Sequence, residues 1–143
     1  MPLWKDLGRI KDVPQDYPLL LTNGKEETYM MSGFRQVASM RIVRPDPLVE
    51  LHPETAQKLG LEEGKWIYIE TETGRAKQKL SLNHNIDPRL VLAAFGWWFP
   101  EKNDSGLGWQ ETNLNMLVPG GPDYDPSTGD VTLRGIPCRV YAA

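Results

Sequence analysis

The sequence has few of the residues that bind metals or form disulfides. Its 143 residues include one cysteine, Cys138, and two histidines, His52 and His84. A single cysteine excludes an internal disulfide, and it excludes a thiolate zinc site or an iron–sulfur cluster held by this chain alone. We therefore expect no metal site within the chain.

Long apolar runs and an excess of positive charge are also missing. No stretch approaches the ~20 apolar residues of a transmembrane helix, and residues 1–16 contain no signal-peptide core. We expect no membrane insertion. The 16 basic and 19 acidic residues give a net charge of −3, which argues against nucleic-acid binding through bulk positive charge.

The familiar catalytic motifs are absent as well. The chain has no G-x-S-x-G, C-x-x-C or H-E-x-x-H motif and no P-loop lysine motif. The adjacent acids Glu26–Glu27 and Glu62–Glu63 are typical of a solvated surface. His52 precedes a proline at a helix start, where it either caps the helix or faces a ligand, and the cap is the favoured interpretation. We predict no catalytic residue.

Short strands and turns account for most of the remaining pattern. Glycine (13) and proline (12) are numerous, which indicates short elements joined by turns. Apolar runs and alternating segments predict strands over residues 18–22, 48–51, 66–71, 76–82, 90–95, 131–134 and 138–141. The third and fourth form a hairpin, and Pro53 and Gly60 bound one short helix. This pattern predicts a small, mostly β barrel or sandwich.

A long segment after the first strand carries groups suited to an anionic ligand. Glycines let backbone N–H groups approach a phosphate closely, and hydroxyls and cations add hydrogen bonds and charge. The candidates are Thr22, Gly24, Lys25, Ser32 and Arg35. An ordinary surface loop is the alternative interpretation.

A second long segment begins with Gly96, Trp97, Trp98 and Phe99. Three successive rings either fill the core or form a surface for a planar ligand or another domain, and we expect them to be partly exposed. Further along, the Asn115 amide either caps a helix-like turn or contacts a purine edge.

Taken in order, these segments resemble a known family over about residues 17–141. The opening motif is a strand followed by Thr22-Asn23-Gly24-Lys25 and then by Ser32 and Arg35. The later matching positions are Pro47, Glu50, His52, Pro53, Ala56, Leu59, Gly60, Gly64, Phe95-Gly96-Trp97-Trp98, Asn115-Met116-Leu117-Val118, Asp125-Pro126 and Arg134. The ordered set is similar to the molybdopterin dinucleotide-binding domain, the C-terminal domain of dimethyl sulfoxide reductase-type molybdenum or tungsten oxidoreductases.

The resemblance implies a fold and a role. The fold would be a double-psi β-barrel of the aspartate decarboxylase-like class, with short helices and long loops, over residues 17–143 after a lead-in at 1–16. The role would be to cover the guanine dinucleotide ends of two pterin cofactors, the bis form of molybdopterin guanine dinucleotide, without catalytic activity in isolation. Molybdenum or tungsten and any iron–sulfur cluster would be held by the remaining domains or subunits, which would be the partners of this chain.

Cofactor contacts follow from the same resemblance, residue by residue. They are Thr22, Gly24, Lys25, Ser32, Arg35, Gly96, Trp97, Trp98, Asn115 and Arg134. Three positions depart from the family pattern. Lys25 stands where Arg is common and cannot form the bidentate phosphate contact of Arg, Met30 replaces a common His, and Val118 replaces a Thr.

Finer features of the resemblance concern the branch and the compartment. The run from Trp97 to Glu101 resembles the thiosulfate, polysulfide or acetylene hydratase-like branch of the family. A secretion signal would lie at the far N-terminus of the whole subunit, so the compartment stays open between cytoplasm and periplasm.

Two other functions compete with cofactor binding. A double-psi barrel can serve as a protein-interaction module without a cofactor, which would equally explain an exposed aromatic run. A small decarboxylase of the same barrel class would need a self-cleaving Gly-Ser bond, and the chain has no Gly-Ser pair. The identity of bound ligands would separate the first two functions.

Overall fold

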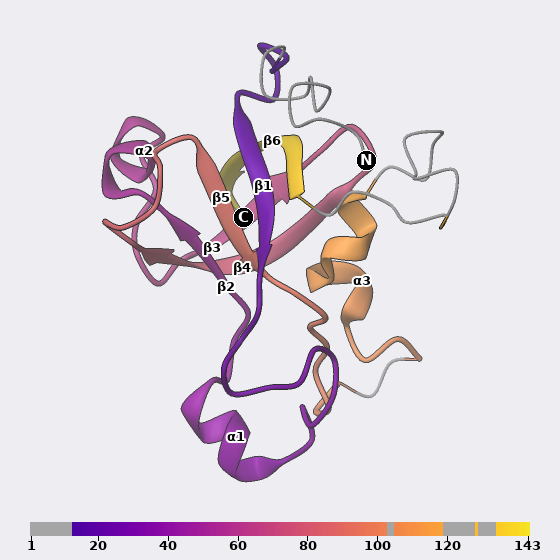
Figure 1. The fold of residues 1–143 in the computed structure, drawn as a ribbon. Coiled ribbons are helices and arrows are strands. Elements are labelled where there is room, and N and C mark those ends of the chain that lie inside the picture. Colours follow the sequence, from indigo (N-terminus) through magenta and orange to yellow (C-terminus); the bar gives the residue numbers. More distant parts are fainter. Residues whose placement is uncertain (1–12, 103–104, 119–127, 129–133) are drawn as a thin grey trace.

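Six strands close into a barrel (Figure 1). The computed structural model describes residues 13–102, 105–118, 128 and 134–143. The strands are β1 (Leu19–Gly24), β2 (Leu48–Leu51), β3 (Trp66–Glu70), β4 (Arg75–Leu82), β5 (Leu90–Ala94) and β6 (Arg134–Ala142). Their order is β1-β5-β2-β4-β3-β6. Two pairs, β1 with β5 and β2 with β4, are parallel and the other four are antiparallel. The prediction of a mostly β, closed barrel is confirmed.

The helices are short and lie outside the barrel wall. They are α1 (Ala38–Val43), α2 (Pro53–Lys58), α3 (Trp109–Thr112) and the 3-10 turn η3 (Leu114–Leu117). The sequence signals of α2 are confirmed, because the His52 side chain accepts a hydrogen bond from the Glu54 N–H at 3.2 Å and Pro53 is the first helical residue. His52 is therefore a helix cap. By contrast, α1 falls where the sequence predicted only a loop.

The last strand differs from the expectation. Residues 131–133 lie outside the described part of the chain, and β6 runs without a break from Arg134 through Pro137 to Ala142. Pro137 stands opposite Leu20 of β1 in the antiparallel register. The expected Asp125-Pro126 turn also lies outside the described residues.

One hydrophobic cluster fills the barrel. Its members, all buried, are Leu19, Leu21, Val49, Leu51, Ala56, Ile67, Ile69, Ala76, Leu80, Val91, Ala93, Leu114, Leu117, Ile136, Cys138 and Val140. Burial raises the pKa of the Cys138 thiol to about 12, so this cysteine is a neutral core residue at physiological pH. Among the described residues, no helix is long and apolar enough to cross a membrane.

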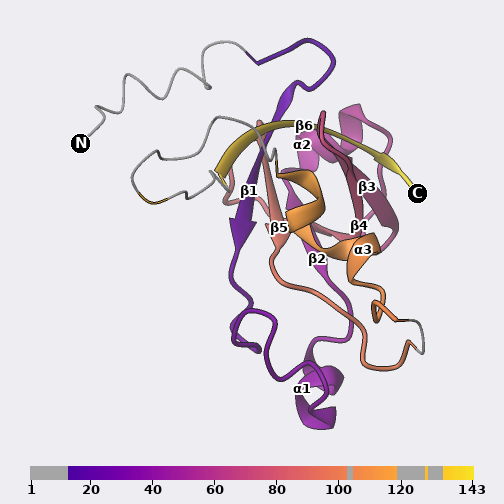
Figure 2. The same ribbon diagram turned by 90° about the vertical axis from the view of Figure 1, so that its right-hand side faces the viewer.

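A projecting segment joins β1 to β2. We call residues 25–47 the excursion; it carries α1, which stands apart from the barrel in both views (Figures 1 and 2). A second buried cluster supports the excursion and consists of Tyr29, Ala94, Trp97 and Phe99, with Met40 and Trp66 packed against it. This cluster joins the excursion to the chain that leaves β5.

Candidate functional site

The candidate residues on β1 and β6 meet at one rim of the barrel. Thr22 lies opposite Arg134 in the β1–β6 register, and Gly24 lies opposite Ala94 in the β1–β5 register. The Arg134 Nε group donates to the Asn23 side-chain oxygen at 3.4 Å. The excursion and the segment after β5 both leave from this rim. The structure therefore brings Thr22, Gly24, Lys25 and Arg134 to neighbouring strand ends.

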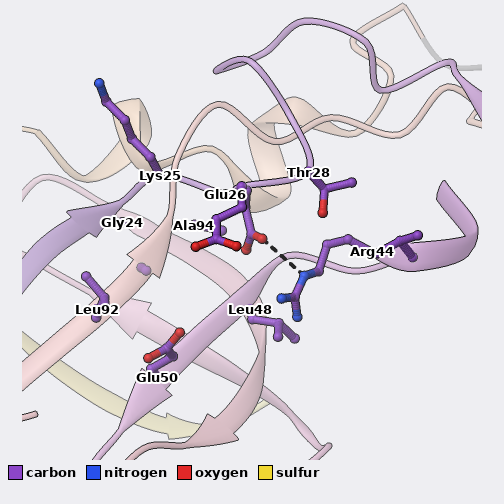
Figure 3. Close-up of a pocket in the computed structure, with 12 residues that line it drawn as sticks. Gly24, Lys25, Glu26, Thr28, Arg44, Leu48, Glu50, Leu92 and Ala94 are labelled. Carbon is purple, nitrogen blue, oxygen red and sulfur yellow. Dashed lines mark ion pairs between the residues drawn. The ribbon is translucent and has the colours of Figure 1, made fainter. Parts of the chain in front are cut away.

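Two cations lie exposed at this rim. Lys25 and Arg134 are exposed, and within the described ranges neither forms an ion pair. Figure 3 shows the Lys25 side chain extending outward from the end of β1. Unpaired cations beside backbone N–H groups are suited to phosphate oxygens, which accept charge-assisted hydrogen bonds.

The excursion touches the segment after β5 through Ser32, Gly96 and Trp98. The indole N–H of Trp98 donates to the Ser32 carbonyl at 2.6 Å. Gly96 has φ +67°, and a Cβ there would lie 3.0 Å from the Ser32 nitrogen. The two backbones approach so closely that only glycine fits this position.

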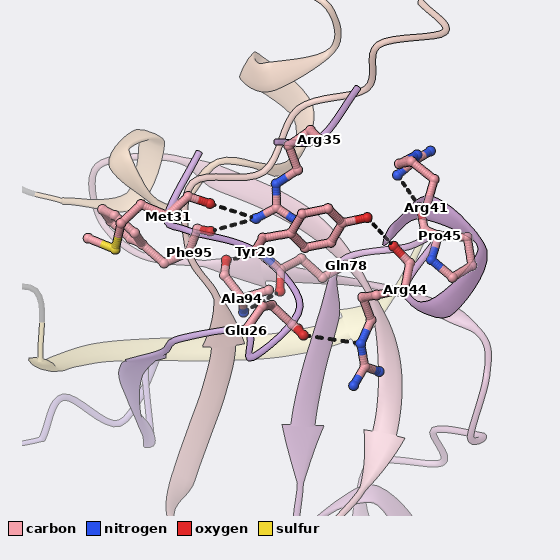
Figure 4. A network of polar contacts seen from close by, with 10 residues as sticks. All are labelled: Glu26, Tyr29, Met31, Arg35, Arg41, Arg44, Pro45, Gln78, Ala94 and Phe95. Atoms are coloured by element: carbon pink, nitrogen blue, oxygen red, sulfur yellow. Dashed lines mark hydrogen bonds and ion pairs between the residues drawn. The ribbon is translucent and has the colours of Figure 1, made fainter. Parts of the chain in front are cut away.

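Arg35 is a buried cation that lies beside Tyr29, with hydrogen bonds to Met31 and Phe95 drawn as dashed lines (Figure 4). Its guanidinium contacts the rings of Tyr29 and Trp97, which lie nearly at right angles to each other and whose centroids are 4.0 and 3.8 Å from Cζ. The Nη2 group donates to the carbonyls of Met31 and Phe95 at 3.0 and 3.2 Å. Arg35 thereby joins two segments that are sixty residues apart in the sequence.

The surroundings of Arg35 are mainly apolar, although the Glu26 carboxylate also acts on its charge. Burial lowers its pKa to about 10, so the side chain is still cationic at neutral pH. Its Nε and Nη1 groups are buried and find no hydrogen-bond partner in the part of the chain described. The two neighbouring rings, the two carbonyls and the charge of Glu26 compensate this charge. As a cofactor ligand, Arg35 has no accessible surface in this structure.

The expectation of exposed rings in the aromatic run is wrong for two of the three residues. Trp97 has no exposed surface and Phe99 is 8% exposed; only Trp98 is partly open. The reason is Arg35 and its neighbours, since Trp97 packs edge-to-face on both Tyr29 and Phe99. The rings fill the second core cluster, and Trp97 can act on a ligand only through packing.

A pocket of about 480 Å³ opens beside Gly24 and Lys25 (Figure 3). Its charged lining residues are Lys25, Glu26, Glu27, Arg44 and Glu50. Arg44 Nε lies 3.1 Å from a Glu26 oxygen, and Asn83 donates to Glu50 at 2.5 Å. Sequence reasoning had assigned the pair Glu26–Glu27 to a solvated surface. That is wrong for Glu26, whose side chain is 13% exposed.

The burial of Glu26 has a consequence for its ionisation. Desolvation raises the pKa of this carboxyl above its ordinary 4.5, although Arg44 and Arg35 pull it in the opposite direction. The pocket thus holds a carboxylate whose charge is incompletely compensated by the protein. A ligand with N–H donors would supply the missing hydrogen bonds.

A test of Glu26 follows from the direction of its shift. The native state holds this proton more tightly than the unfolded chain does, so stability is lost as pH rises from 4.5 through the raised pKa. We expect Glu26→Gln to be more stable than the unsubstituted chain at pH 7.5 and nearly equal to it at pH 4, measured by urea unfolding. Glu27 is an exposed neighbour, so Glu27→Gln should show no such pH-dependent difference in stability. Equal behaviour of the two variants would contradict a raised pKa at Glu26.

Gln78 is a polar core residue that the sequence pattern did not single out. It is fully buried, its amide nitrogen donates to the carbonyls of Ala94 and Thr112 at 2.9 and 3.1 Å, and its oxygen accepts from the Ala94 N–H at 2.9 Å. Gln78 therefore fixes the end of β5, from which the Gly96–Trp98 segment leaves.

Asn115 has no hydrogen bond or ion pair to the other candidates among the described residues. It is exposed on η3, and η3 packs on the β3–β4 turn, where the Thr71 hydroxyl donates to the Leu117 carbonyl at 2.8 Å. No contact joins Asn115 to Lys25 or Arg134 within the described ranges. Nor does any group of three His, Cys, Asp or Glu side chains in those ranges form a metal site.

Comparison with known proteins gives a consistent result. The family model described as the molydopterin dinucleotide binding domain matches residues 19–137. Dopamine dehydroxylase of Eggerthella lenta is 36% identical over 140 residues, which are 97% of this chain and 13% of that protein. Acetylene hydratase of Syntrophotalea acetylenica is 33% identical over 130 residues, which are 87% of this chain and 18% of that protein.

A solved structure has the same fold. Acetylene hydratase from Pelobacter acetylenicus superimposes with a TM-score of 0.84 at 32% identity, covering 97% of this chain and 19% of that one. The chain thus spans less than a fifth of the length of these relatives.

Proposed function

The chain belongs to the molybdopterin dinucleotide-binding domains of dimethyl sulfoxide reductase-family oxidoreductases. From this premise we propose that it covers the guanine dinucleotide ends of two pterin cofactors. We also propose that the chain has no catalytic activity alone. The observation that carries the proposal is the coincidence of the family match, residues 19–137, with two exposed cations, Lys25 and Arg134, at one rim of the barrel. The rest of the enzyme would hold the metal and any cluster. We place the start of the domain near Tyr17, two residues before β1.

The residues at the rim fit such a cofactor by their chemistry. Lys25 and Arg134 supply positive charge for phosphate oxygens, and Thr22 and Ser32 supply hydroxyl donors. The neighbouring pocket offers the opposite chemistry, because the Glu26 and Glu50 carboxylates accept hydrogen bonds from N–H groups such as those of a guanine edge. A dinucleotide presents both kinds of group.

Each residue then has a defined part in binding. Arg134 and Lys25 neutralise phosphate charge, and the close Gly96–Ser32 contact fixes the backbone on which the Ser32 hydroxyl stands. Arg35 acts one layer below as a positioning residue, since it ties the excursion to the segment after β5. When bound, the cofactor and its metal supply the redox chemistry, and this chain contributes binding and orientation.

Ligand analysis of the intact native protein tests the proposal directly. We expect mass spectrometry of the released small molecules to show pterin guanine dinucleotide, and we expect the 143-residue chain alone to reduce no acceptor with an artificial electron donor. A native protein that carries no pterin but retains a partner protein would favour the interaction-module alternative. Turnover by the isolated chain, after metal contamination is excluded, would refute the inactive-module proposal.

A further inference from the structure

The excursion exposes an unusual share of the apolar side chains. Eight large hydrophobic residues are exposed in the described part of the chain, and five of them lie on the excursion. These five, which we call the apolar face, are Met30 (70% exposed), Met31 (46%), Phe34 (47%), Ile42 (83%) and Val43 (71%). Scattered single apolar residues are ordinary on a protein surface, whereas a concentration on one element marks an interaction site.

The helix that carries part of this face does not stabilise itself. The six residues of α1 include no buried side chain, and no side chain caps its N-terminus. A helix this short is marginal in water without tertiary packing. The segment is held by Met40, which packs on the second buried cluster, and by polar contacts at its edges. Arg41 pairs with Glu101 and donates to the Pro45 carbonyl at 2.5 Å, and the Tyr29 hydroxyl donates to the Arg44 carbonyl at 2.8 Å.

The excursion is therefore anchored from beneath, with its apolar face outward. The contacts of buried Arg35 with the Tyr29 and Trp97 rings fix the first half of the excursion, and the Arg41 and Tyr29 hydrogen bonds fix α1. Left-handed backbone at Met31 (φ 55°) and Phe34 (φ 68°) turns the chain at two of the exposed positions, and such conformations of non-glycine residues carry a strain cost. Holding a strained, apolar surface in water is costly unless something covers it.

We infer that the apolar face docks on an apolar protein surface of the rest of the same enzyme. This rests on the proposed function, because the relatives contain more than four-fifths of their length outside the part matched by this chain. Ile42 is the most exposed of the five, has no polar atom in its side chain, and does not line the pocket beside Gly24 and Lys25 that we assign to the cofactor, whereas Val43 lies at the edge of that pocket. A protein surface is the occupant whose chemistry matches the apolar face, and rigid anchoring lowers the entropy lost on docking.

Methionine oxidation in the intact native protein provides the test. Met30 is the more exposed of the two methionines on the face, and methionine oxidation follows exposure. We expect hydrogen peroxide to oxidise Met30 in the native protein at least about tenfold more slowly than in the same protein unfolded in guanidinium. An oxidation rate equal to the unfolded one would overturn the inference. Two other results would also overturn it. Protection of Met30 that disappears when only the cofactor is removed would mean that the cofactor covers the face. Protection in a species with the mass of two copies of this chain would mean that a second copy covers it.

Substitutions separate the apolar face from the rest of the surface. The variant Ile42→Lys, at a position that does not line the cofactor pocket, should speed the oxidation of Met30 in the native protein. Leu59→Lys is the matched control, because Leu59 is 45% exposed at the end of α2, and it should leave the rate unchanged. Equal rates in the two variants would contradict the assignment of α1 to the interface. Ligand analysis of the same samples distinguishes the two proposals. If Met30 is protected but no pterin is bound, only the cofactor proposal is refuted. If pterin is bound but Met30 is not protected, only the docking proposal is refuted.

Discussion

Replacing Arg35 by alanine is expected to lower the free energy of unfolding of the 143-residue chain by about 3–5 kcal/mol. The substitution removes the cation that contacts Tyr29 and Trp97 and leaves the carbonyls of Met31 and Phe95 without their donor. It also opens a cavity among rings that are otherwise closely packed. Chemical denaturation at pH 7 measures the loss.

Two further substitutions separate charge from shape at this position. Arg35→Lys keeps the charge but lacks the planar guanidinium that contacts both rings while it donates to two carbonyls, so it should still be clearly destabilising. Arg35→Met keeps much of the volume, removes the desolvated charge, and should be less harmful than alanine.

The matched control for Arg35→Ala is Arg75→Ala. Arg75 also lies over a tyrosine ring, 4.7 Å from the centroid of Tyr68, but on the surface. An exposed cation–π contact is worth only about 0.5–1 kcal/mol, so this variant should remain close to the unsubstituted chain. Similar losses of unfolding free energy for Arg35→Ala and Arg75→Ala would show that burial does not strengthen the contacts of Arg35 with its neighbouring rings.

The barrel was predictable because its signals are local. The apolar run before Asn23-Gly24 marks β1, the alternation on both sides of Gly74 marks the β3–β4 hairpin, and His52 and Pro53 mark α2. Each of these depends on residues within a few positions of one another. The choice of a double-psi barrel came from the family resemblance, and the order of strands around it was not predicted, since no local pattern encodes which strand ends meet.

The interior of the site was not predictable for the opposite reason. A polar segment with glycines, such as residues 23–36, reads as surface, yet Arg35 is the most completely enclosed cation of the described chain. Its partners Phe95 and Trp97 lie sixty residues away, and no local pattern reveals them. The same long-range contact explains why Trp97 is buried where exposure was expected. Similarly, α1 has no cap and no buried face from which a helix could be predicted.

The candidate contacts divide into residues that the pairing of strands brings together and a residue that lies outside the strands. Thr22, Gly24, Lys25 and Arg134 lie on paired strand ends, so a correct barrel brings them together whatever their function. Asn115 lies on a 3-10 turn that packs on the β3–β4 turn, and its part in binding is still a prediction.

The largest functional effect is expected at Arg134. Arg134→Ala in the intact native protein should reduce retention of the pterin dinucleotide by roughly 10- to 150-fold, because a hydrogen bond to a charged group contributes ~1.5–3 kcal/mol. The loss should leave the fold unchanged, since Arg134 is exposed and its one described contact is the 3.4 Å hydrogen bond to Asn23. Retention is measured as the molar ratio of pterin to protein after extended dialysis, with the melting temperature recorded for each variant.

Two comparisons make this result specific to the rim. Arg89 is exposed and paired with Asp87 at 2.9 Å, and it precedes β5, at the end of the barrel away from Gly24 and Ala94. Arg89→Ala removes the same charge and should not change retention, whereas Lys25→Ala should reduce it less than Arg134→Ala because an ammonium makes a single-point contact. Equal losses for Arg89→Ala and Arg134→Ala would mean that net charge, rather than the strand ends of β1 and β6, governs binding. Unchanged retention in Arg134→Ala would remove Arg134 from the site while leaving the family assignment intact.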